Sequence, residues 1–157
     1  MAGWNLTVDL KGFDEISEKF KHSPQIINEA TKQMLTKATL IAMGKAKENS
    51  PIDKGMLRGS IQSRVEGEGQ EMVGIVGTNV EYAKWQEFGT GTYAGRGYIT
   101  PKRARMLAWQ DKSGQWIFAR AVRGVPAKKY MLSGLEEVKA KMNEIIKLGV
   151  EVIQRQL

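Results

Sequence analysis

The feature that most constrains the fold is an apolar stripe that keeps helical spacing over residues 24–49. Its members recur three or four positions apart: Ile26, Ile27, Ala30, Met34, Ala38, Ile41, Ala42 and Ala46. Ser23 is a suitable N-cap and Pro24 fits the first helical position, while Asn49-Ser50-Pro51 ends the pattern. Such a helix extends about 39 Å at about 1.5 Å per residue. We therefore expect it to cover a sheet, and its length leaves open that it also packs between subunits.

Shorter periodic segments predict the elements around this helix. Alternating apolar residues predict a strand over 4–10, and spacings of three and four predict a short helix over 13–21. Two β-rich segments, 57–66 and 71–77, are expected to form a hairpin around the glycine-rich loop 67–70. The first half of the chain thus predicts helices and antiparallel strands in alternation.

The second half is expected to contain, in order, helical turns over 82–88, a flexible or sharply turned loop over 89–97, and a hairpin of segments 104–110 and 115–123. Ser133 and Glu136 have the spacing of a capping box, which predicts a C-terminal helix that runs nearly to the last residue. The order of elements indicates the α+β class, with an antiparallel sheet of about four strands packed by the long N-terminal helix and the C-terminal helix. We expect one domain over 1–157, in which the loop and basic hairpin 89–129 are an elaboration.

Composition excludes several classes of protein. The chain has 157 residues and no cysteine, so we expect neither disulfides nor a thiolate metal site. No apolar run approaches the about 20 residues that cross a bilayer, and the first residues lack the basic and apolar regions of a signal peptide. We therefore expect no membrane association and folding in the cytoplasm. Lys and Arg exceed Asp and Glu by 24 minus 17, or +7, which favours acidic partners.

Catalytic chemistry is largely missing from the sequence. The single histidine, His22, lies in a helix-capping junction, and no nucleophile-elbow motif accompanies it. Glu66, Glu68 and Glu71 form the nearest cluster of oxygen ligands, but they flank a hairpin loop without calcium-loop spacing. The glycines of 89–97 match neither a dinucleotide loop nor a P-loop. We expect no catalytic, cofactor or metal site and hence no enzyme.

The basic region between Pro101 and Lys129 is a stronger candidate for function. It holds eight cations against Asp111 alone: Lys102, Arg103, Arg105, Lys112, Arg120, Arg123, Lys128 and Lys129. Trp109, Trp116 and Phe118 are interleaved with them. Three interpretations stay open: rings that face the hairpin core while cations face water, a subunit or partner interface, and a platform on which nucleic-acid bases stack.

Two motifs in the middle of the chain carry a family resemblance. The first comprises Ser50, Pro51, Asp53, Gly55, Leu57, Ser60 and Ile61, and the second Gly77, Thr78, Tyr82, Ala83, Glu87, Phe88, Gly89 and Thr90. With these residues in this order, the chain resembles the tail-completion family of long-tailed phages, also described as head-tail joining or minor capsid proteins. Two positions depart from the family pattern: Lys54 stands where threonine is common, and residues 127–132 replace a Pro-Phe-Leu approach to the last helix.

The motif residues have physical roles of their own. Pro51 and Gly55 are expected to turn the chain from helix to sheet, and Asp53 to cap backbone N–H groups there. Tyr82, Trp85 and Phe88 lie three apart, so helical turns place their rings on one side, either as interface anchors or as core. The predicted structural-motif residues are Pro51, Asp53, Gly55, Leu57, Tyr82, Trp85, Glu87, Phe88 and Gly89.

The resemblance implies a non-enzymatic virion protein at the neck or tail end, assembled in the host cytoplasm. It implies a ring, expected to have six subunits, that joins the tail tube to the head connector or stopper proteins, with contact to DNA in the channel an open option. Six cations are assigned to the oligomer or partner interface: Arg96, Lys102, Arg103, Arg105, Arg120 and Arg123. The alternative function is a basic nucleic-acid-binding module that uses the hairpin 101–129.

Overall fold

The computed structural model describes residues 24–53 and 55–156, and these divide into two compact units. Unit 1 combines the chain up to Val80 with the chain from Tyr130, and unit 2 is Glu81–Lys129. The strand predicted over 4–10, the helix over 13–21 and the cap at Ser23 lie outside the described residues. The expectation of one domain over 1–157 stays a prediction.

Unit 1 is organised around one long helix. Helix α2 spans Pro24–Asn49, as the apolar stripe predicts. Its buried residues form a narrow face of mostly small side chains: Ala30, Met34, Leu35, Ala38, Thr39, Ala42 and Ala46. The buried Ser50 ends the helix, where its hydroxyl donates to the carbonyl of Lys47 at 2.8 Å. A face this rich in alanine lets neighbouring elements approach the helix backbone closely.

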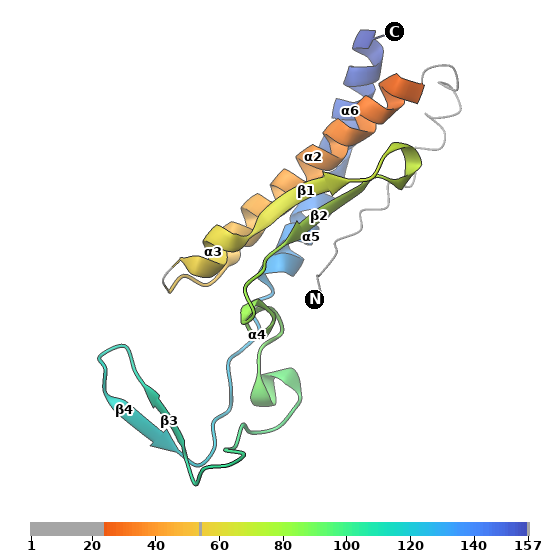
Figure 1. Ribbon diagram of the computed structural model, residues 1–157. Coiled ribbons are helices and arrows are strands. Elements are labelled where there is room, and N and C mark those ends of the chain that lie inside the picture. The colour runs from red at the N-terminus through yellow and green to blue at the C-terminus, as the bar shows by residue number, and fades with distance from the viewer. Residues whose placement is uncertain (1–23, 54, 157) are drawn as a thin grey trace. The chain divides into compact units, whose positions relative to one another are not determined.

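Two layers use that face. Helices α5 (Tyr130–Ala140) and α6 (Met142–Gln156) run alongside α2, and the hairpin of β1 (Gln62–Glu66) and β2 (Val73–Gly77) packs against it as well (Figure 1). The largest side chains of this core include Tyr130, Ile145 and Ile153, each at most 2% exposed. The core of unit 1 therefore lies where α2 meets the C-terminal helices and the hairpin.

Glycines set the distance between α2 and its neighbours. A Cβ atom on Gly134 of α5 would lie 2.5 Å from the carbonyl oxygen of Ala42, and one on Gly74 of β2 would lie 2.5 Å from Thr39 Cγ2. On α6, a Cβ atom on Gly149 would collide with the Met34 side chain. Since real Cβ contacts are longer than this, α2 approaches each of these elements as closely as glycine permits.

The strands confirm the α+β class but correct the expected sheet. Strand β1 pairs antiparallel with β2, from Gln62 opposite Gly77 to Glu66 opposite Val73. In unit 2, β3 (Leu107–Gln110) pairs antiparallel with β4 (Trp116–Ala119). The described strands thus form two separate two-stranded sheets. One sheet of four strands was expected wrongly, because β1 and β2 belong to the α2 layer whereas β3 and β4 are held within unit 2.

Two predicted boundaries are also wrong. Residues 57–60 are helical, in α3 (Met56–Ser60), because Gly55 takes a φ of 75° before the helix and Leu57 is buried to 2% exposure. The strand begins only at Gln62, and the loop after it contains the 3-10 turn η1 (Gly69–Glu71). A positive φ at Gly55 is not visible in a pattern of apolar residues.

The C-terminal helix begins earlier than its expected capping box. Helix α5 starts at Tyr130, so Ser133 lies within it and its hydroxyl donates to the Tyr130 carbonyl at 2.7 Å. The same hydroxyl accepts from Asn49 Nδ2 at 2.8 Å, which links α5 to the end of α2. The helix is divided at Lys141, after which α6 continues. Ser133 therefore makes a tertiary contact instead of an N-cap.

The close approach of α5 and α6 to α2 predicts different losses of folding stability when Gly134 and Gly149 are replaced by alanine. We expect Gly134→Ala to destabilise the protein by about 1–3 kcal/mol, because its methyl meets a backbone carbonyl that cannot move without displacing α5. Both substitutions gain about 1 kcal/mol of helix propensity, but Gly149→Ala meets the flexible Met34 side chain instead of backbone, so its net cost should be smaller. Urea denaturation of both variants measures the difference. Equal midpoints would contradict the account of α2 packing.

Candidate interaction surface

Unit 2 has almost no hydrophobic core of its own. Of the 15 buried hydrophobic residues in the described chain, Ala83 alone lies in Glu81–Lys129. Of the 15 large hydrophobic residues that are exposed, 11 lie in this unit: Tyr82, Trp85, Phe88, Tyr93, Tyr98, Ile99, Met106, Trp109, Trp116, Phe118 and Val125. Monomeric proteins rarely concentrate exposed apolar side chains in this way. The surface of unit 2 is thus the strongest candidate for contact with another molecule.

Helix α4 (Ala83–Phe88) presents the first three of these rings. The residues lie three apart, and Tyr82, Trp85 and Phe88 are 41%, 44% and 48% exposed. The opposite face of α4 buries Ala83 and Glu87. Lys84 Nζ stands 4.5 Å from the centre of the Trp85 ring, a cation–π contact. The predicted helical turns are confirmed, and the three rings are exposed instead of belonging to the core; their role as interface anchors stays a prediction.

After α4, glycines bring two backbone segments into contact. Gly89, Gly91 and Gly124 have φ angles of 74°, 59° and 94°. A Cβ atom on Gly89 would lie 2.8 Å from the Val125 carbonyl oxygen, and Cβ atoms on Gly91 and Gly124 would collide with the carbonyls of Arg123 and Thr90. Only glycine accepts both the positive φ and the close approach. The positive φ and the close contact therefore explain why glycine is required at Gly89, the last glycine of the family motif.

Hydrogen bonds fasten the same two segments. The Thr90 N–H donates to the Val125 carbonyl at 2.8 Å, and the Val125 N–H donates to Thr90 Oγ1 at 2.8 Å. The Thr92 N–H donates to the Arg123 carbonyl at 2.8 Å. Residues Gly91–Ala94 then form the 3-10 turn η2. The loop expected over 89–97 is accordingly of the sharply turned kind.

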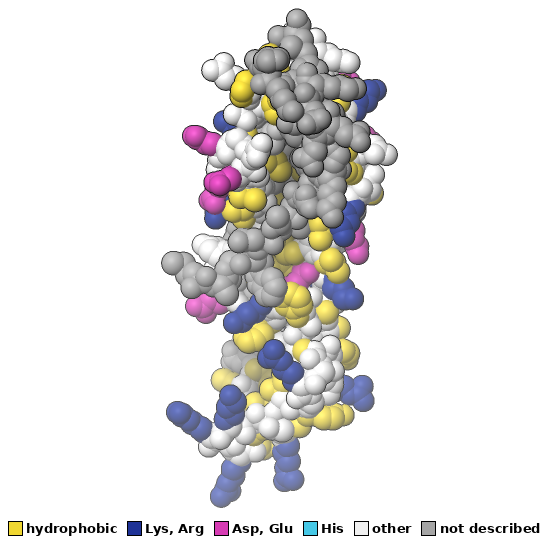
Figure 2. Space-filling model, turned by 90° about the vertical axis from the view of Figure 1, so that its right-hand side faces the viewer, with side chains coloured by type: hydrophobic (Ala, Val, Ile, Leu, Met, Phe, Trp, Pro, Cys, Tyr) yellow, Lys and Arg dark blue, Asp and Glu magenta, His cyan; other side chains and the backbone are white. Residues whose placement is uncertain are grey.

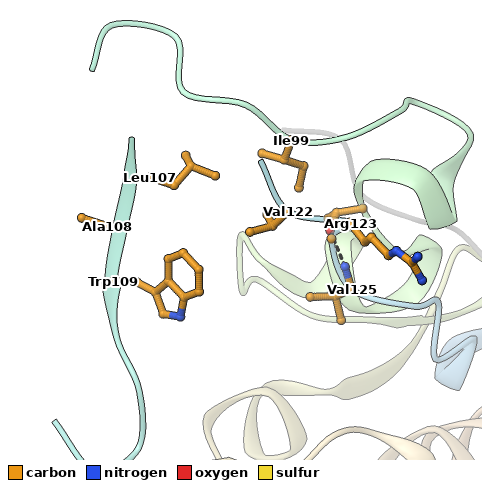
Figure 3. Close-up of a pocket in the computed structure, with 9 residues that line it drawn as sticks. Ile99, Leu107, Ala108, Trp109, Val122, Arg123 and Val125 are labelled. Carbon is orange, nitrogen blue, oxygen red and sulfur yellow. Dashed lines mark hydrogen bonds between the residues drawn. The ribbon is translucent and has the colours of Figure 1, made fainter. Parts of the chain in front are cut away.

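A pocket of about 410 Å³ opens beside these segments. Its side chains are mainly apolar and come from three parts of unit 2: Ile99, Leu107, Trp109, Val122, Arg123 and Val125. Figure 3 shows Leu107 and Trp109 on β3 facing Ile99, Val122 and Val125 across the opening, whereas the Arg123 guanidinium points away from it. Ile99 and Val122 are joined by two backbone hydrogen bonds, of 2.8 and 3.0 Å. The pocket thus has a wall whose backbone groups are already paired.

The β3–β4 hairpin has the predicted turn and an unexpected exposed face. Asp111 Oδ1 accepts from the Ser113 hydroxyl and from the N–H groups of Ser113 and Gln115, at 2.6, 2.8 and 3.0 Å. These hydrogen bonds, the Ser113 hydroxyl first, hold the pKa of the Asp111 carboxyl below its ordinary value. On β4, Trp116 and Phe118 are 58% and 60% exposed, with ring centres 6.3 Å apart.

The exposure of these rings corrects one interpretation of the hairpin, in which the aromatic side chains face its core. Ile117 and Ala119, which alternate with the rings along β4, take the less exposed positions. A two-stranded hairpin has only one inner face, and on β3 the pocket-lining Leu107 and Trp109 supply it. The Trp116 and Phe118 face is therefore left to solvent or to a partner.

All six cations assigned to an interface are exposed: Arg96, Lys102, Arg103, Arg105, Arg120 and Arg123. Within residues 24–53 and 55–156, no carboxylate lies within 4.0 Å of any of them. Figure 2 shows Lys and Arg side chains projecting among hydrophobic ones on unit 2, in the lower part of the view. Their assignment to an interface stays a prediction, and their exposure is compatible with it.

The net charge of the protein is confined to unit 2. Residues 81–129 contain ten Lys and Arg and three Asp and Glu, a balance of +7. The rest of the chain has 24 minus 10 cations and 17 minus 3 anions, 14 of each, and is neutral. A charge so distributed gives unit 2 a net positive field and leaves unit 1 without net charge.

The structural-motif residues divide between the units. In unit 1, Pro51 and Asp53 lie in the turn after α2, Gly55 is the N-cap residue of α3, and Leu57 is buried. The two motifs meet at Ser60 and Thr78, whose hydroxyl oxygens are 2.6 Å apart. In unit 2, Tyr82, Trp85, Glu87 and Phe88 lie in or beside α4, and Gly89 follows it. Capping by Asp53, which is exposed, stays a prediction.

Sequence reasoning missed the pocket residues Ile99, Leu107, Val122 and Val125. They lie in short segments without sustained periodicity and converge only through backbone pairing between 90–99 and 122–125. The only usable signal was Gly124, whose positive φ permits that pairing. Conversely, the structure brings none of the predicted cations except Arg123 into the lining of the pocket.

Across the described part of the chain, no group of three or more His, Asp or Glu side chains is placed to hold a metal ion. None of the described helices is long and apolar enough to cross a membrane. His22 lies outside the described residues.

Comparison with known proteins finds one similarity, in the first part of the chain. Residues 14–89 match the family model HK97-gp10_like, described as "Bacteriophage HK97-gp10, putative tail-component". In this segment, just under half of its length, the chain is similar to the HK97-gp10-like family of phage tail components. The comparisons found no similar curated protein and no similar solved structure.

The HK97-gp10-like segment has clear structural limits. It includes α2, α3, the β1–β2 hairpin and α4, and it ends at Gly89, the first of the three close-packed glycines. Most of unit 2, with the pocket and the β3–β4 hairpin, follows it. The resemblance to phage tail proteins is thereby confirmed, and a phage tail component is a structural protein of the virion.

The close contact between backbone segments 89–92 and 123–127 gives a prediction for unit 2. We expect Gly91→Ala to destabilise this unit by about 2–4 kcal/mol, because a left-handed alanine costs about 1–2 kcal/mol and its methyl also meets the Arg123 carbonyl. Gly97→Ala is the matched control, since Gly97 has a φ of 76° but open space around it. Hydrogen exchange at the Thr92 and Ile99 amides reports the loss. If both variants exchange alike, steric contact between the segments is not what holds them.

Proposed function

We propose that this protein joins the phage tail tube to the head connector as a non-enzymatic structural component of the neck. In this proposal, copies of the chain form a ring at the tail end, assembled in the host cytoplasm, as in minor capsid or tail-completion proteins. Its partners are its own copies, the tail-tube protein and the connector or stopper proteins, and its channel-facing surface meets DNA. The number of six subunits rests on the resemblance to tail-completion proteins.

The observation that carries the proposal is the contrast between the two units. Unit 1 buries 14 of the 15 core hydrophobic residues of the described chain, whereas unit 2 buries one and exposes 11 large ones. Burial of this exposed apolar area in an interface would stabilise an assembly. A packed scaffold that carries an uncovered, aromatic-rich unit is suited to assembly with other proteins.

The distribution of charge supports a ring. Two copies of unit 2 placed against each other in a two-fold contact would bring two charges of +7 together, and like charges in an interface are unfavourable. A contact between different surfaces of neighbouring copies avoids this repulsion. Such heterologous contacts generate rings where the rotation closes. The charge of unit 2 thus favours head-to-tail assembly over a symmetric dimer.

Charge reversal on the basic hairpin tests the proposal. In a phage that lacks its own copy of this gene, we expect the double variant Arg103→Glu, Arg105→Glu to lower the yield of joined, infectious particles about tenfold or more. Both side chains are exposed and without a described carboxylate partner, so the unfolding midpoint should stay unchanged. Electron microscopy of the lysate would then show heads and tails that have not joined.

The control is the double variant Lys32→Glu, Lys37→Glu, which makes the same change of charge on exposed positions of α2. It should support normal particle yield. Normal joining by the Arg103, Arg105 variant would contradict the proposed role of unit 2. Absence of the protein from purified virions would contradict the proposed function as a whole.

A further inference from the structure

We propose that the pocket of unit 2 binds a large apolar side chain carried on an acidic segment of another virion protein. That the partner belongs to the virion rests on the proposed function. The chemistry of the segment, apolar at its centre and acidic around it, rests on the pocket and on the charge of unit 2. No described segment of the chain fills this pocket.

The pocket selects an apolar side chain. Its lining side chains Ile99, Leu107, Trp109, Val122 and Val125 present hydrocarbon surface, and Ile99, Trp109 and Val125 remain 37–43% exposed. Its volume of about 410 Å³ is within the range of sites that hold a bulky group. Burial of a Leu or aromatic side chain there removes apolar area from water on both partners.

Part of the backbone that forms the pocket wall is already paired. The N–H and carbonyl groups of Ile99 and Val122 bond to each other, the Thr90 N–H donates to the Val125 carbonyl, and the Val125 N–H donates to the Thr90 hydroxyl. Strand β3 is paired with β4 along one edge only, in a two-stranded sheet. What the pocket itself offers to an occupant is its apolar lining, which fits a side chain.

Cations lie close in sequence to the residues that line the pocket. Arg123 is one of the lining residues, although its guanidinium points away from the opening, and Arg105 lies two positions before Leu107. Arg120 follows Ala119, which pairs with Leu107, so it lies at the end of the hairpin that forms the pocket wall. With a charge of +7 on unit 2, carboxylates that flank the anchoring side chain gain favourable interactions and faster association.

The apolar lining favours a protein over nucleic acid as the occupant. Nucleic acid covers cations with phosphates and stacks bases on aromatic faces, and its interfaces are more polar than those of proteins. It offers little to the branched side chains of Leu107, Val122 and Val125, which are among the lining residues. A second copy of unit 2 is disfavoured by its own positive charge. A protein segment with an apolar side chain and flanking acidic residues matches both the apolar lining of the pocket and the positive charge of unit 2.

The test uses the purified full chain and defined probes. Three hexapeptides are compared: acetyl-Glu-Asp-Leu-Trp-Asp-Glu-amide, its counterpart with four lysines in place of the acids, and its counterpart with two serines in place of Leu-Trp. A 20-nucleotide single-stranded DNA is the fourth probe. Methyl NMR of Ile99, Leu107, Val122 and Val125 locates binding. We expect the acidic Leu-Trp peptide to perturb these methyls and to bind about tenfold or more tightly than either other peptide.

A pair of variants separates pocket binding from charge attraction in general. Val125→Glu adds a carboxylate at the pocket and should weaken the acidic peptide about tenfold. Trp116→Glu adds the same charge to unit 2, but neither Trp116 nor its partner Gln110 lines the pocket, so the loss should stay within about twofold. Unchanged amide resonances of Thr92 and Ile99 establish that the Val125 variant is folded.

Each other outcome overturns the inference. If the acidic and lysine peptides bind equally, charge does not select the partner. If the serine peptide binds as tightly as the acidic Leu-Trp peptide, the pocket does not bind an apolar side chain. Displacement of the acidic peptide by the DNA at lower concentration assigns the site to nucleic acid, and self-association through these methyls assigns it to a second copy. The assay needs no phage, so peptide binding by a protein that is absent from virions would refute the proposed function while leaving the pocket chemistry in place.

Discussion

The close approach of neighbouring elements to α2 is the constraint on which the rest of unit 1 depends. Gly134 of α5 packs closely against Ala42, and Gly74 of β2 packs closely against Thr39. The single helix α2 therefore contacts both the C-terminal helices and the hairpin. With such small residues, dispersion between closely packed backbones replaces much of the interdigitation of large side chains. Ser60 of the first family motif and Thr78 of the second are hydrogen-bonded beside the open end of the same hairpin, within unit 1.

Unit 2 is held together differently. Its order comes from backbone pairing that three glycines permit, from the Asp111 turn and from the two hydrogen bonds between Ile99 and Val122. These contacts define a shape without burying its large side chains, and a two-stranded hairpin alone is only marginally stable in water. The features that leave unit 2 uncovered are thus the ones that equip it for assembly. Its aromatic rings, its pocket and its uncompensated cations all face outward.

The sequence predicted the structure well where apolar residues keep helical spacing over many residues. It failed where contacts between distant segments determine the structure. The alanine-rich stripe predicted α2 to its last residue, and the turn 111–114 located the second hairpin. Residues 57–60 were assigned to a strand because the positive φ at Gly55 leaves no periodic signal. Strand alternation allowed Trp116 and Phe118 to face the core of the hairpin, but in the structure both rings are exposed. The pocket was not predictable, since its walls meet only through the pairing of distant backbone segments.

The central claim is that unit 2 completes the burial of its apolar surface only in an assembly. Oxidative footprinting of the tryptophans in the free protein and in purified virions measures this most directly. The account predicts strong protection of Trp85, Trp109 and Trp116 in the virion, while the exposed Met56 of unit 1 serves as the reference. Tryptophans in unit 2 that oxidise as fast in the virion as in the free protein would contradict it.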